Sequence, residues 1–206
     1  MPDIVVRKLD FCDYQSTWTQ MQTFTNERNE LSPDEIWLLE HYPVYTQGQA
    51  CSALPTGRDD IPVVHSDRGG QITYHGPGQL VVYTLIDLRR LRTGVKSMVH
   101  LLEQTVIDYL ADMSLAADRI GGAPGVYVHG KKICALGLRV RRGASYHGLS
   151  LNVDMDLSPY SSIDPCGYQN LEVTQLKDLG ISVPMDEVQR LLAKRLVDGI
   201  NGIGTR

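Results

Sequence analysis

The sequence lacks the features that place a protein in a membrane or outside the cell. Its 206 residues contain no apolar run near the roughly 18 residues that span a bilayer. Segment 1–7 has no basic stretch followed by an apolar one, so it does not resemble a secretion signal. The four cysteines form no C-x-x-C pair and are too few for a disulfide framework. We therefore expect a cytoplasmic protein with free thiols.

The composition shows no excess of basic residues and no bias towards disorder. Apolar residues make up 42% of the chain and charged residues 21%, as in ordinary globular proteins. The net charge of −4 argues against a dedicated nucleic-acid-binding protein, which is usually basic. No internal repeat, low-complexity tract or long linker divides the sequence. We expect a single domain over residues 1–206.

Helical and strand periodicities alternate along the chain. Apolar stripes predict helices over 94–113 and 186–197, and Asp13 is placed to cap another. Strands are predicted at 4–9, 36–39, 79–86, 125–129, 131–140 and 145–153. The stretch 43–62 is interrupted by glycine and proline and is predicted to be irregular. Strands on both sides of a long helix favour an α/β (α+β) protein with a mixed sheet.

A glycine-rich segment, 67–79, precedes one of the predicted strands. Glycine lets the backbone approach a ligand closely, and Arg68, Thr73 and His75 offer hydrogen-bond donors beside it. The segment has neither the G-x-x-x-x-G-K-[ST] order of a phosphate loop nor the G-x-G-x-x-G dinucleotide fingerprint. Nucleotide binding is therefore not supported. A plain glycine-rich turn is the alternative interpretation.

Lys132 lies in a predicted strand that is otherwise largely apolar. Strand alternation places it on one face with Cys134, Leu136 and Leu138. In such surroundings desolvation lowers the pKa of a lysine, which can then act as a base near neutral pH. The alternative is a lysine at a sheet edge whose ammonium group reaches solvent.

Cys166 stands between Pro165 and Gly167. Proline stiffens the approach and glycine permits a tight turn, so this thiol is a candidate for display in a cleft. Cys134, within an apolar strand, is expected to be a small buried side chain. His147 and His75 are candidate partners for a thiol dyad, and spacing alone does not decide which base meets the cysteine.

Four sequence blocks together resemble the signature blocks of the lipoyl(octanoyl) transferases, the octanoyl-[acyl carrier protein]:protein N-octanoyltransferases. They are R-G-G-Q-I-T-Y-H-G-P-G-Q (68–79), G-K-K-I-C-A-L-G-L-R-V-R-R-G (130–143), Y-H-G-L-S-L-N-V (146–153) and P-C-G-Y (165–168). The resemblance covers nearly the whole chain. It implies the fold of the biotin and lipoate protein ligase catalytic core, a mixed sheet with flanking helices.

The resemblance also implies roles for single residues. Cys166 matches the nucleophile that carries the acyl thioester, and Lys132 matches the acid/base that lowers the pKa of the thiol. His147 is a possible supporting residue. The residues that match the substrate-binding segments are Arg68, Gly69, Gly70, Gln71, Ile72, Thr73, Tyr74, His75, Ala135, Leu136, Gly137, Gly148, Leu149 and Ser150.

The implied reaction transfers an octanoyl group from octanoyl-acyl carrier protein to a lysine of lipoyl domains. The acceptors would be the lipoyl domains of 2-oxoacid dehydrogenase complexes and the glycine-cleavage H protein. No ATP, metal or other cofactor is expected, and no nucleic acid or membrane partner. Two basic clusters are predicted to steer an acidic carrier. One consists of Arg89, Arg90 and Arg92, and the other of Arg139, Arg141 and Arg142. A solvated charged face is the alternative.

Other functions fit parts of the same sequence. An ATP-dependent lipoate or biotin ligase needs no nucleophilic cysteine, and usually carries an R-R-x-S-G-G-G-type loop where this chain has D-R-G-G-Q. A thiol hydrolase would pair Cys166 with His147 and release free octanoate. A catalytically inactive binding module is disfavoured by the presence of both Lys132 and Cys166.

Overall fold

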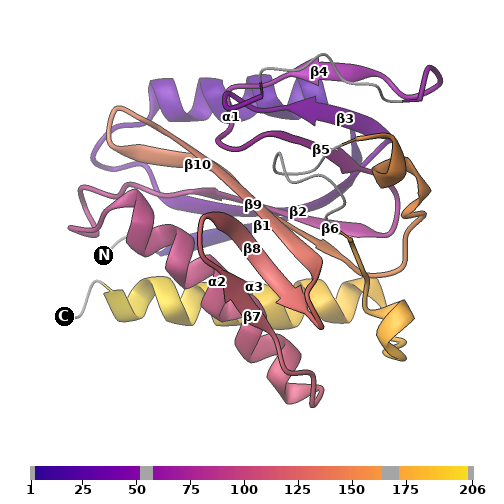
Figure 1. Ribbon diagram of the computed structural model, residues 1–206. Coiled ribbons are helices and arrows are strands. Elements are labelled where there is room, and N and C mark those ends of the chain that lie inside the picture. Colours follow the sequence, from indigo (N-terminus) through magenta and orange to yellow (C-terminus); the bar gives the residue numbers. More distant parts are fainter. Residues whose placement is uncertain (1–2, 52–57, 164–171, 204–206) are drawn as a thin grey trace.

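A mixed sheet forms the central layer of the molecule (Figure 1). The structure, a computed structural model, describes residues 3–51, 58–163 and 172–203. Within them, seven strands pair in the order β1-β2-β6-β10-β9-β8-β7. Only β1 and β2 are parallel among these described neighbours. The bounds are β1 (Ile4–Cys12), β2 (Asp34–His41), β6 (Gln79–Leu85), β7 (Asp118–Ile120), β8 (Ala123–Val128), β9 (Lys131–Arg141) and β10 (Ala144–Asn152). The predicted mixed sheet is confirmed.

A smaller sheet packs beside the central one and was not predicted. It contains β4 (Val63–His65), β3 (Val44–Gln47) and β5 (Ile72–His75), in the order β4-β3-β5. The expectation of an irregular stretch over 43–62 is therefore wrong for β3. Likewise, part of the glycine-rich segment is the strand β5, because its backbone pairs antiparallel with β3. A short 3₁₀ helix, η1 (Ser158–Ser162), closes this end of the fold.

Three α-helices cover the two faces of the central sheet (Figure 1). Helix α1 (Tyr14–Glu27) lies on one face, while α2 (Val95–Asp112) and α3 (Met185–Ile203) lie on the other. Helix α1 begins as predicted, because the Asp13 carboxylate accepts a hydrogen bond from the Ser16 amide at 2.8 Å. Helix α3 is longer than predicted, and a further 3₁₀ turn, η3 (Lys177–Leu179), precedes it. No helix in the described ranges is long and apolar enough to cross a membrane.

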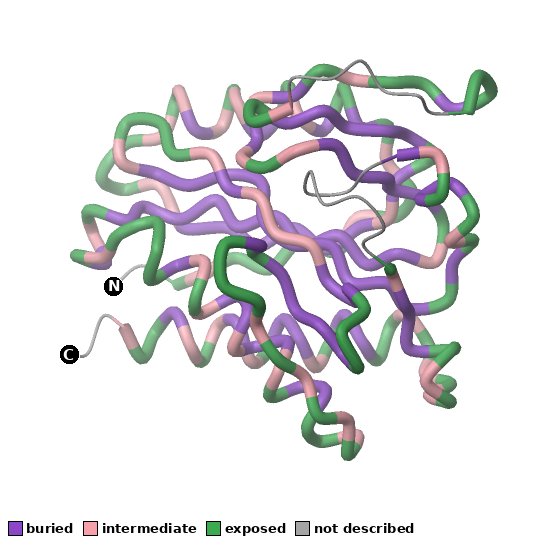
Figure 2. Tube along the Cα trace, viewed as in Figure 1, coloured by how far each residue is buried: buried purple, intermediate pink, exposed green. Residues whose placement is uncertain are grey.

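The central strands are buried on both faces, as the purple tubes of Figure 2 show. Between the sheet and α2 and α3 lies the largest apolar cluster, which includes Leu80, Leu102 and Leu192. Beneath α1 a smaller cluster contains Met21, Trp37 and other side chains of β2, β6 and β10. Burial on two faces explains why β6 is a continuous apolar run and does not alternate.

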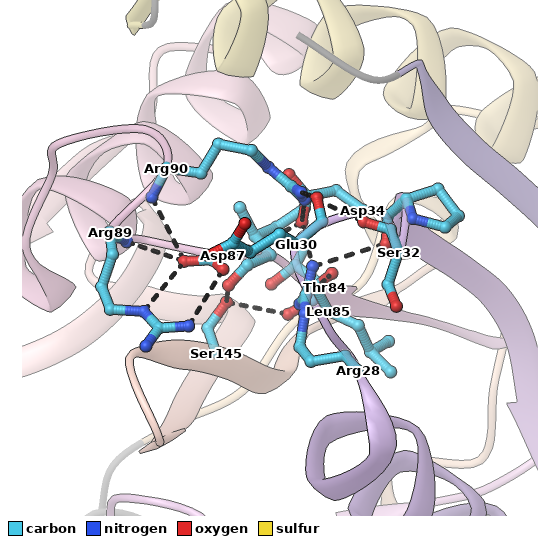
Figure 3. A network of polar contacts seen from close by, with 12 residues as sticks. Arg28, Glu30, Ser32, Asp34, Thr84, Leu85, Asp87, Arg89, Arg90 and Ser145 are labelled. Carbon is cyan, nitrogen blue, oxygen red and sulfur yellow. Dashed lines mark hydrogen bonds and ion pairs between the residues drawn. The ribbon is translucent and has the colours of Figure 1, made fainter.

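A buried carboxylate ties one end of the sheet together (Figure 3). The Asp34 carboxylate forms ion pairs with Arg28 at 2.6 Å and Arg90 at 2.7 Å. It also accepts a hydrogen bond from the backbone amide of Asp87 at 2.8 Å. Arg89 pairs with the Asp87 carboxylate at 3.2 Å. One of the two predicted basic clusters is thus largely occupied by contacts within the fold.

Gly148 of β10 shows how tightly the sheet is packed. A Cβ atom built there would lie 2.0 Å from the carbonyl oxygen of Val82 on β6. We expect Gly148→Ala to lower the free energy of unfolding by about 1–3 kcal/mol, because backbone atoms must move. Urea unfolding checks this. Gly202→Ala, with no atom within 4 Å of the added carbon, is the control and should not destabilise. Equal stability of the two variants would contradict the packing argument.

Candidate active site

A pocket lies on the α1 face of the central sheet, against β5 and η1. It encloses about 710 Å³, counting the open part at its mouth. The predicted site residues that line it are Arg68, Gly70, Gln71, Ile72, Thr73, His75, Lys132, Ala135, Leu136, Gly137, His147, Gly148, Leu149 and Ser150. Three separate sequence blocks therefore meet at one cavity.

The floor of the pocket is made of small residues on two neighbouring strands. Gly137 of β9 is paired with Gly148 of β10, and Ala135 is paired with Ser150. A Cβ atom at Gly137 would lie 2.6 Å from the Gly69 carbonyl oxygen, and one at Gly148 would lie 2.0 Å from the Val82 carbonyl oxygen. The two glycines thus permit close backbone approaches around the pocket.

Two predicted site residues, Gly69 and Tyr74, do not line the pocket. The Tyr74 ring packs between Tyr45 and Tyr160, at centroid distances of 5.6 and 5.7 Å. The Gly69 amide donates to the Leu138 carbonyl at 3.0 Å. The close backbone approach expected at these glycines is therefore made to β9, and the Gly69 amide is already engaged.

Lys132 is buried in the wall of the pocket, with 3% of its surface exposed. Its Nζ atom donates to the Pro124 carbonyl at 3.1 Å and lies 5.1 Å from the centre of the Tyr127 ring. Its backbone pairs with the strand-like segment that follows residue 171: the Lys132 amide donates to the Glu172 carbonyl at 2.8 Å. The prediction of a desolvated lysine is confirmed, and the solvent-reaching alternative is wrong.

The predicted nucleophile, Cys166, lies outside the described residues, between Ile163 and Glu172. Cys134, by contrast, is buried, and burial raises the pKa of its thiol well above the ordinary value. This thiol stays protonated at neutral pH. The expectation that Cys134 is a small buried side chain is confirmed.

Arg68 and His75 are held by the small sheet. The Arg68 guanidinium donates to the Thr46 hydroxyl at 3.0 Å and to the Gly69 carbonyl at 3.0 Å. Burial, the largest effect, lowers the pKa of His75 well below its ordinary value. Its Nδ1 lies 2.7 Å from the Gln79 side-chain oxygen, so a neutral ring donates there.

His147 is fixed by the Asp67 carboxylate at 2.8 Å from its Nε2. Burial lowers the pKa of His147, although Asp67 opposes the shift, so the ring is neutral at pH 7. His147 faces Leu138 across the β10–β9 ladder, six positions from Lys132. At about 3.4 Å per residue, the two backbones are roughly 20 Å apart along the sheet.

Six lining residues were missed from the sequence: Tyr14, Val81, Tyr83, Asn152, Tyr160 and Val173. Asn152 had a usable signal, because it shares strand parity with Gly148 and Ser150. Tyr83 donates to Nε2 of a further buried histidine, His41, at 2.6 Å. Burial lowers the pKa of His41 to about 4.

The second predicted basic cluster lies at the β9–β10 turn, where Arg141 and Arg142 are exposed. Arg139 donates to the Gln49 side chain at 2.5 Å, and Arg142 donates to the Asn26 carbonyl at 2.9 Å. Within the part of the chain that the structure describes, no group of three or more His, Cys, Asp or Glu residues is arranged to hold a metal ion.

The Asp67 carboxylate accepts four side-chain hydrogen bonds beside the pocket. Burial alone would raise the pKa of its carboxyl group, but hydrogen bonds from His147 and Tyr146 outweigh this and hold the pKa well below its usual range. Trp18 Nε1 and Gln22 Nε2 of α1 donate to the same carboxylate at 2.8 and 3.2 Å.

We expect Asp67→Asn to lower the free energy of unfolding at pH 7 by about 1–3 kcal/mol, the cost of weakening charged hydrogen bonds in a buried site. Because the pKa in the fold lies below that of the unfolded chain, this stabilisation is full above about pH 4 and is lost as pH falls through the folded-state pKa. Urea unfolding of both proteins between pH 7 and pH 2 measures the narrowing difference. Asp60→Asn, which alters an exposed carboxylate paired with Arg58, is the control and should leave the free energy of unfolding nearly unchanged at both pH values. A difference that stays constant with pH would refute the role of the charge.

Comparison with known proteins identifies relatives along nearly the whole chain. The family described as the lipoyl protein ligase A/B catalytic domain matches residues 13–197. An octanoyltransferase of Aromatoleum aromaticum is 60% identical over 182 residues, 88% of this chain and 79% of that protein. An octanoyltransferase of Chromobacterium violaceum is 52% identical over 193 residues, 93% of each chain.

Solved structures show the same fold at low sequence identity. The bipartite lipoate protein ligase of Thermoplasma acidophilum superposes with a TM-score of 0.77 at 16% identity, covering 98% of this chain and 85% of that one. The biotin protein ligase of Aquifex aeolicus, in complex with biotin and ATP, superposes with a TM-score of 0.62 at 14% identity, covering 100% and 73%. The expected likeness to the ligase catalytic core is confirmed.

Proposed function

This chain belongs to the family of lipoyl protein ligase A/B catalytic domains, and within it to the octanoyltransferases; we propose that it moves an octanoyl group from octanoyl-acyl carrier protein to a lysine of a lipoyl domain. The observation that carries the proposal is Lys132, a buried lysine in the wall of a pocket with a small-residue floor. Its backbone is joined to Glu172, just after the segment that contains Cys166.

Cys166 is the proposed nucleophile and Lys132 its acid/base. In the sequence Cys166 stands three residues after Ile163 and six before Glu172, whose carbonyl accepts a hydrogen bond from the Lys132 amide. A free thiol has a pKa of about 8.5 and is mostly protonated at pH 7. Lys132 takes the thiol proton, and the resulting ammonium stabilises the thiolate.

In the first half-reaction the thiolate attacks the carbonyl carbon of the octanoyl thioester. The new bond joins that carbon to the Cys166 sulfur, and the bond to the carrier's sulfur breaks. Lys132 returns its proton to the departing sulfur, so the carrier leaves as a thiol. The enzyme is left as an octanoyl thioester beside a neutral lysine.

In the second half-reaction the deprotonated amine of the acceptor lysine attacks the same carbon. A C–N bond forms, the C–S bond breaks, and its electron pair stays on the Cys166 sulfur. The amine proton passes to Lys132, which restores the ammonium–thiolate pair. Conversion of a thioester to an amide is downhill, so the proposed reaction uses no ATP or metal.

The pocket floor accounts for the acyl group. Beside the small residues Gly137, Gly148 and Ala135, the pocket is lined by Leu136, Leu149 and Val81, which supply apolar surface for a hydrocarbon chain. Apolar burial of each methylene group contributes about 0.8 kcal/mol. This favours an aliphatic acyl donor over a purely polar one.

The protein partners in this proposal are the acyl carrier protein and lipoyl domains of 2-oxoacid dehydrogenase complexes or the glycine-cleavage H protein, in the cytoplasm. The exposed arginines at the β9–β10 turn, Arg141 and Arg142, supply positive charge for an acidic carrier. Arg90 is excluded from that role because its guanidinium is bound to Asp34.

The nucleophile is tested by intact-protein mass spectrometry after mixing with octanoyl-acyl carrier protein. Wild-type protein should gain one octanoyl group that hydroxylamine removes. Cys166→Ala should lose both the adduct and transfer to a lipoyl domain. Cys134→Ala is the matched control and should keep both, because its thiol is buried and protonated. An adduct that persists in Cys166→Ala would contradict the proposal. ATP-dependent release of pyrophosphate would also contradict it.

The base is tested by the rate of alkylation of Cys166 with iodoacetamide against pH. Lys132→Met should slow alkylation at neutral pH and abolish transfer, since the thiol loses its proton acceptor and counter-ion. Lys132→Arg keeps the charge but cannot give up its proton, so transfer should be nearly lost. His147→Ala should lower activity without eliminating it, because His147 is held by Asp67 far along the sheet. If His147→Ala loses the wild-type profile while Lys132→Met keeps it, the histidine is the base.

A further inference from the structure

One peptide group lies between Lys132 and a buried carboxylate of the opposite layer. The carbonyl oxygen of Pro124 accepts a hydrogen bond from Lys132 Nζ at 3.1 Å. The N–H of the same peptide belongs to Gly125 and donates to Glu103 Oε1 of α2 at 3.1 Å. Glu103 is 7% exposed and Lys132 is 3% exposed, so both ends of this connection are buried.

From this arrangement we propose that Glu103 is a positioning residue for the transfer reaction, acting on Lys132 through the Pro124–Gly125 peptide. The inference rests on the proposed function, in which Lys132 is the acid/base. Glu103 itself does not line the pocket and touches no substrate.

The physical effect has a geometric and an electrostatic part. The Glu103 carboxylate fixes the plane of the peptide and thereby the direction of the Pro124 carbonyl towards Lys132 Nζ. A charged acceptor on the N–H also polarises the peptide, so its carbonyl becomes a stronger acceptor for an ammonium group. Glu103 therefore favours the ammonium form of Lys132, which is the partner of the Cys166 thiolate.

The surroundings are built to keep this connection in place. Arg119 of β7 holds the second oxygen of Glu103 at 2.9 Å. Gly125 has a φ of 148°, and a Cβ atom there would lie 2.9 Å from Lys132 Cε and 2.7 Å from the Cys134 carbonyl. Glycine is required at this position because any side chain would push against the lysine or against β9.

Other titratable groups around Lys132 bear on its charge. The ring of Tyr127 on β8 faces the Lys132 ammonium, and the Cys134 thiol belongs to the same strand as Lys132. The exposed pair of Lys131 and Glu172 flanks its backbone. Among these groups, Glu103 is the buried carboxylate. Two hydrogen bonds and one peptide group connect it to the Lys132 ammonium.

The test compares Glu103→Gln and Glu103→Leu with wild type. The glutamine keeps an acceptor oxygen for the Gly125 amide but loses the charge, whereas leucine loses both. We expect Glu103→Gln to slow octanoyl transfer to Cys166 about tenfold, with KM for the octanoyl donor unchanged. The pH midpoint of iodoacetamide alkylation at Cys166 should move upwards. Glu103→Leu should slow transfer further and raise the pH midpoint of alkylation by more than Glu103→Gln does.

The matched control is Glu35→Gln, which removes another buried carboxylate, paired with Arg7 on β1 and absent from the residues that line the pocket. It should lose stability in urea but keep the wild-type alkylation midpoint and transfer rate. If the folded Glu103 variants also keep the wild-type alkylation midpoint and transfer rate, while Lys132→Met changes these two quantities, the inference is overturned and the proposed function stands. If Lys132→Met also keeps the wild-type alkylation midpoint and transfer rate, the proposed function fails and the inference fails with it.

Discussion

The Asp67 carboxylate is the constraint on which the geometry of the pocket depends. It accepts hydrogen bonds from Trp18 and Gln22 of α1 and from Tyr146 and His147 of β10. The carboxylate is partly buried, with 22% of its side chain exposed, so separating it from these four donors would lower the stability of the fold. The next residues along the chain are Arg68 and the glycines, and their place over β9 follows from this anchor.

The same anchor requires an exception to strand geometry. Tyr146 and His147 are consecutive, so in a regular strand their side chains would point to opposite faces of the sheet. His147 has a φ of 61°, an uncommon value for a residue that is not glycine, and both side chains reach Asp67. Sequence parity could not reveal this, because the conformation is stabilised by a carboxylate about 80 positions earlier in the chain.

Local patterns predicted the central elements well, because burial and periodicity are properties of neighbouring residues. The strands around Lys132 and Gln79 and the long helix α2 are confirmed for that reason. For Lys132 the predicted burial is right, but the predicted face is only partly right. Cys134 and Leu138 belong to one core cluster and Leu136 packs against it, while Leu136 and Lys132 also line the pocket.

Features made by distant segments escaped prediction. The small sheet pairs Val44–Gln47 with Ile72–His75, two short strands whose own patterns are weak. Tyr14 and Tyr83 reach the pocket from α1 and β6, and neither belongs to a block that drew attention by its composition. In the same way Glu103 looks like an ordinary polar residue of an amphipathic helix. Its contact with the Gly125 amide exists only once α2 has packed on the sheet.

The two ends of the pocket differ in how they respond to protons. At one end burial lowers the pKa of His75 and His147, which line the pocket, and of His41, which is hydrogen-bonded to the lining residue Tyr83. These rings therefore stay neutral above about pH 6.5. At the other end Lys132 is linked through one peptide to a carboxylate. In the proposed mechanism, a change in reaction rate above about pH 6.5 is assigned to Cys166 and Lys132, because the neutral histidines neither gain nor lose charge there.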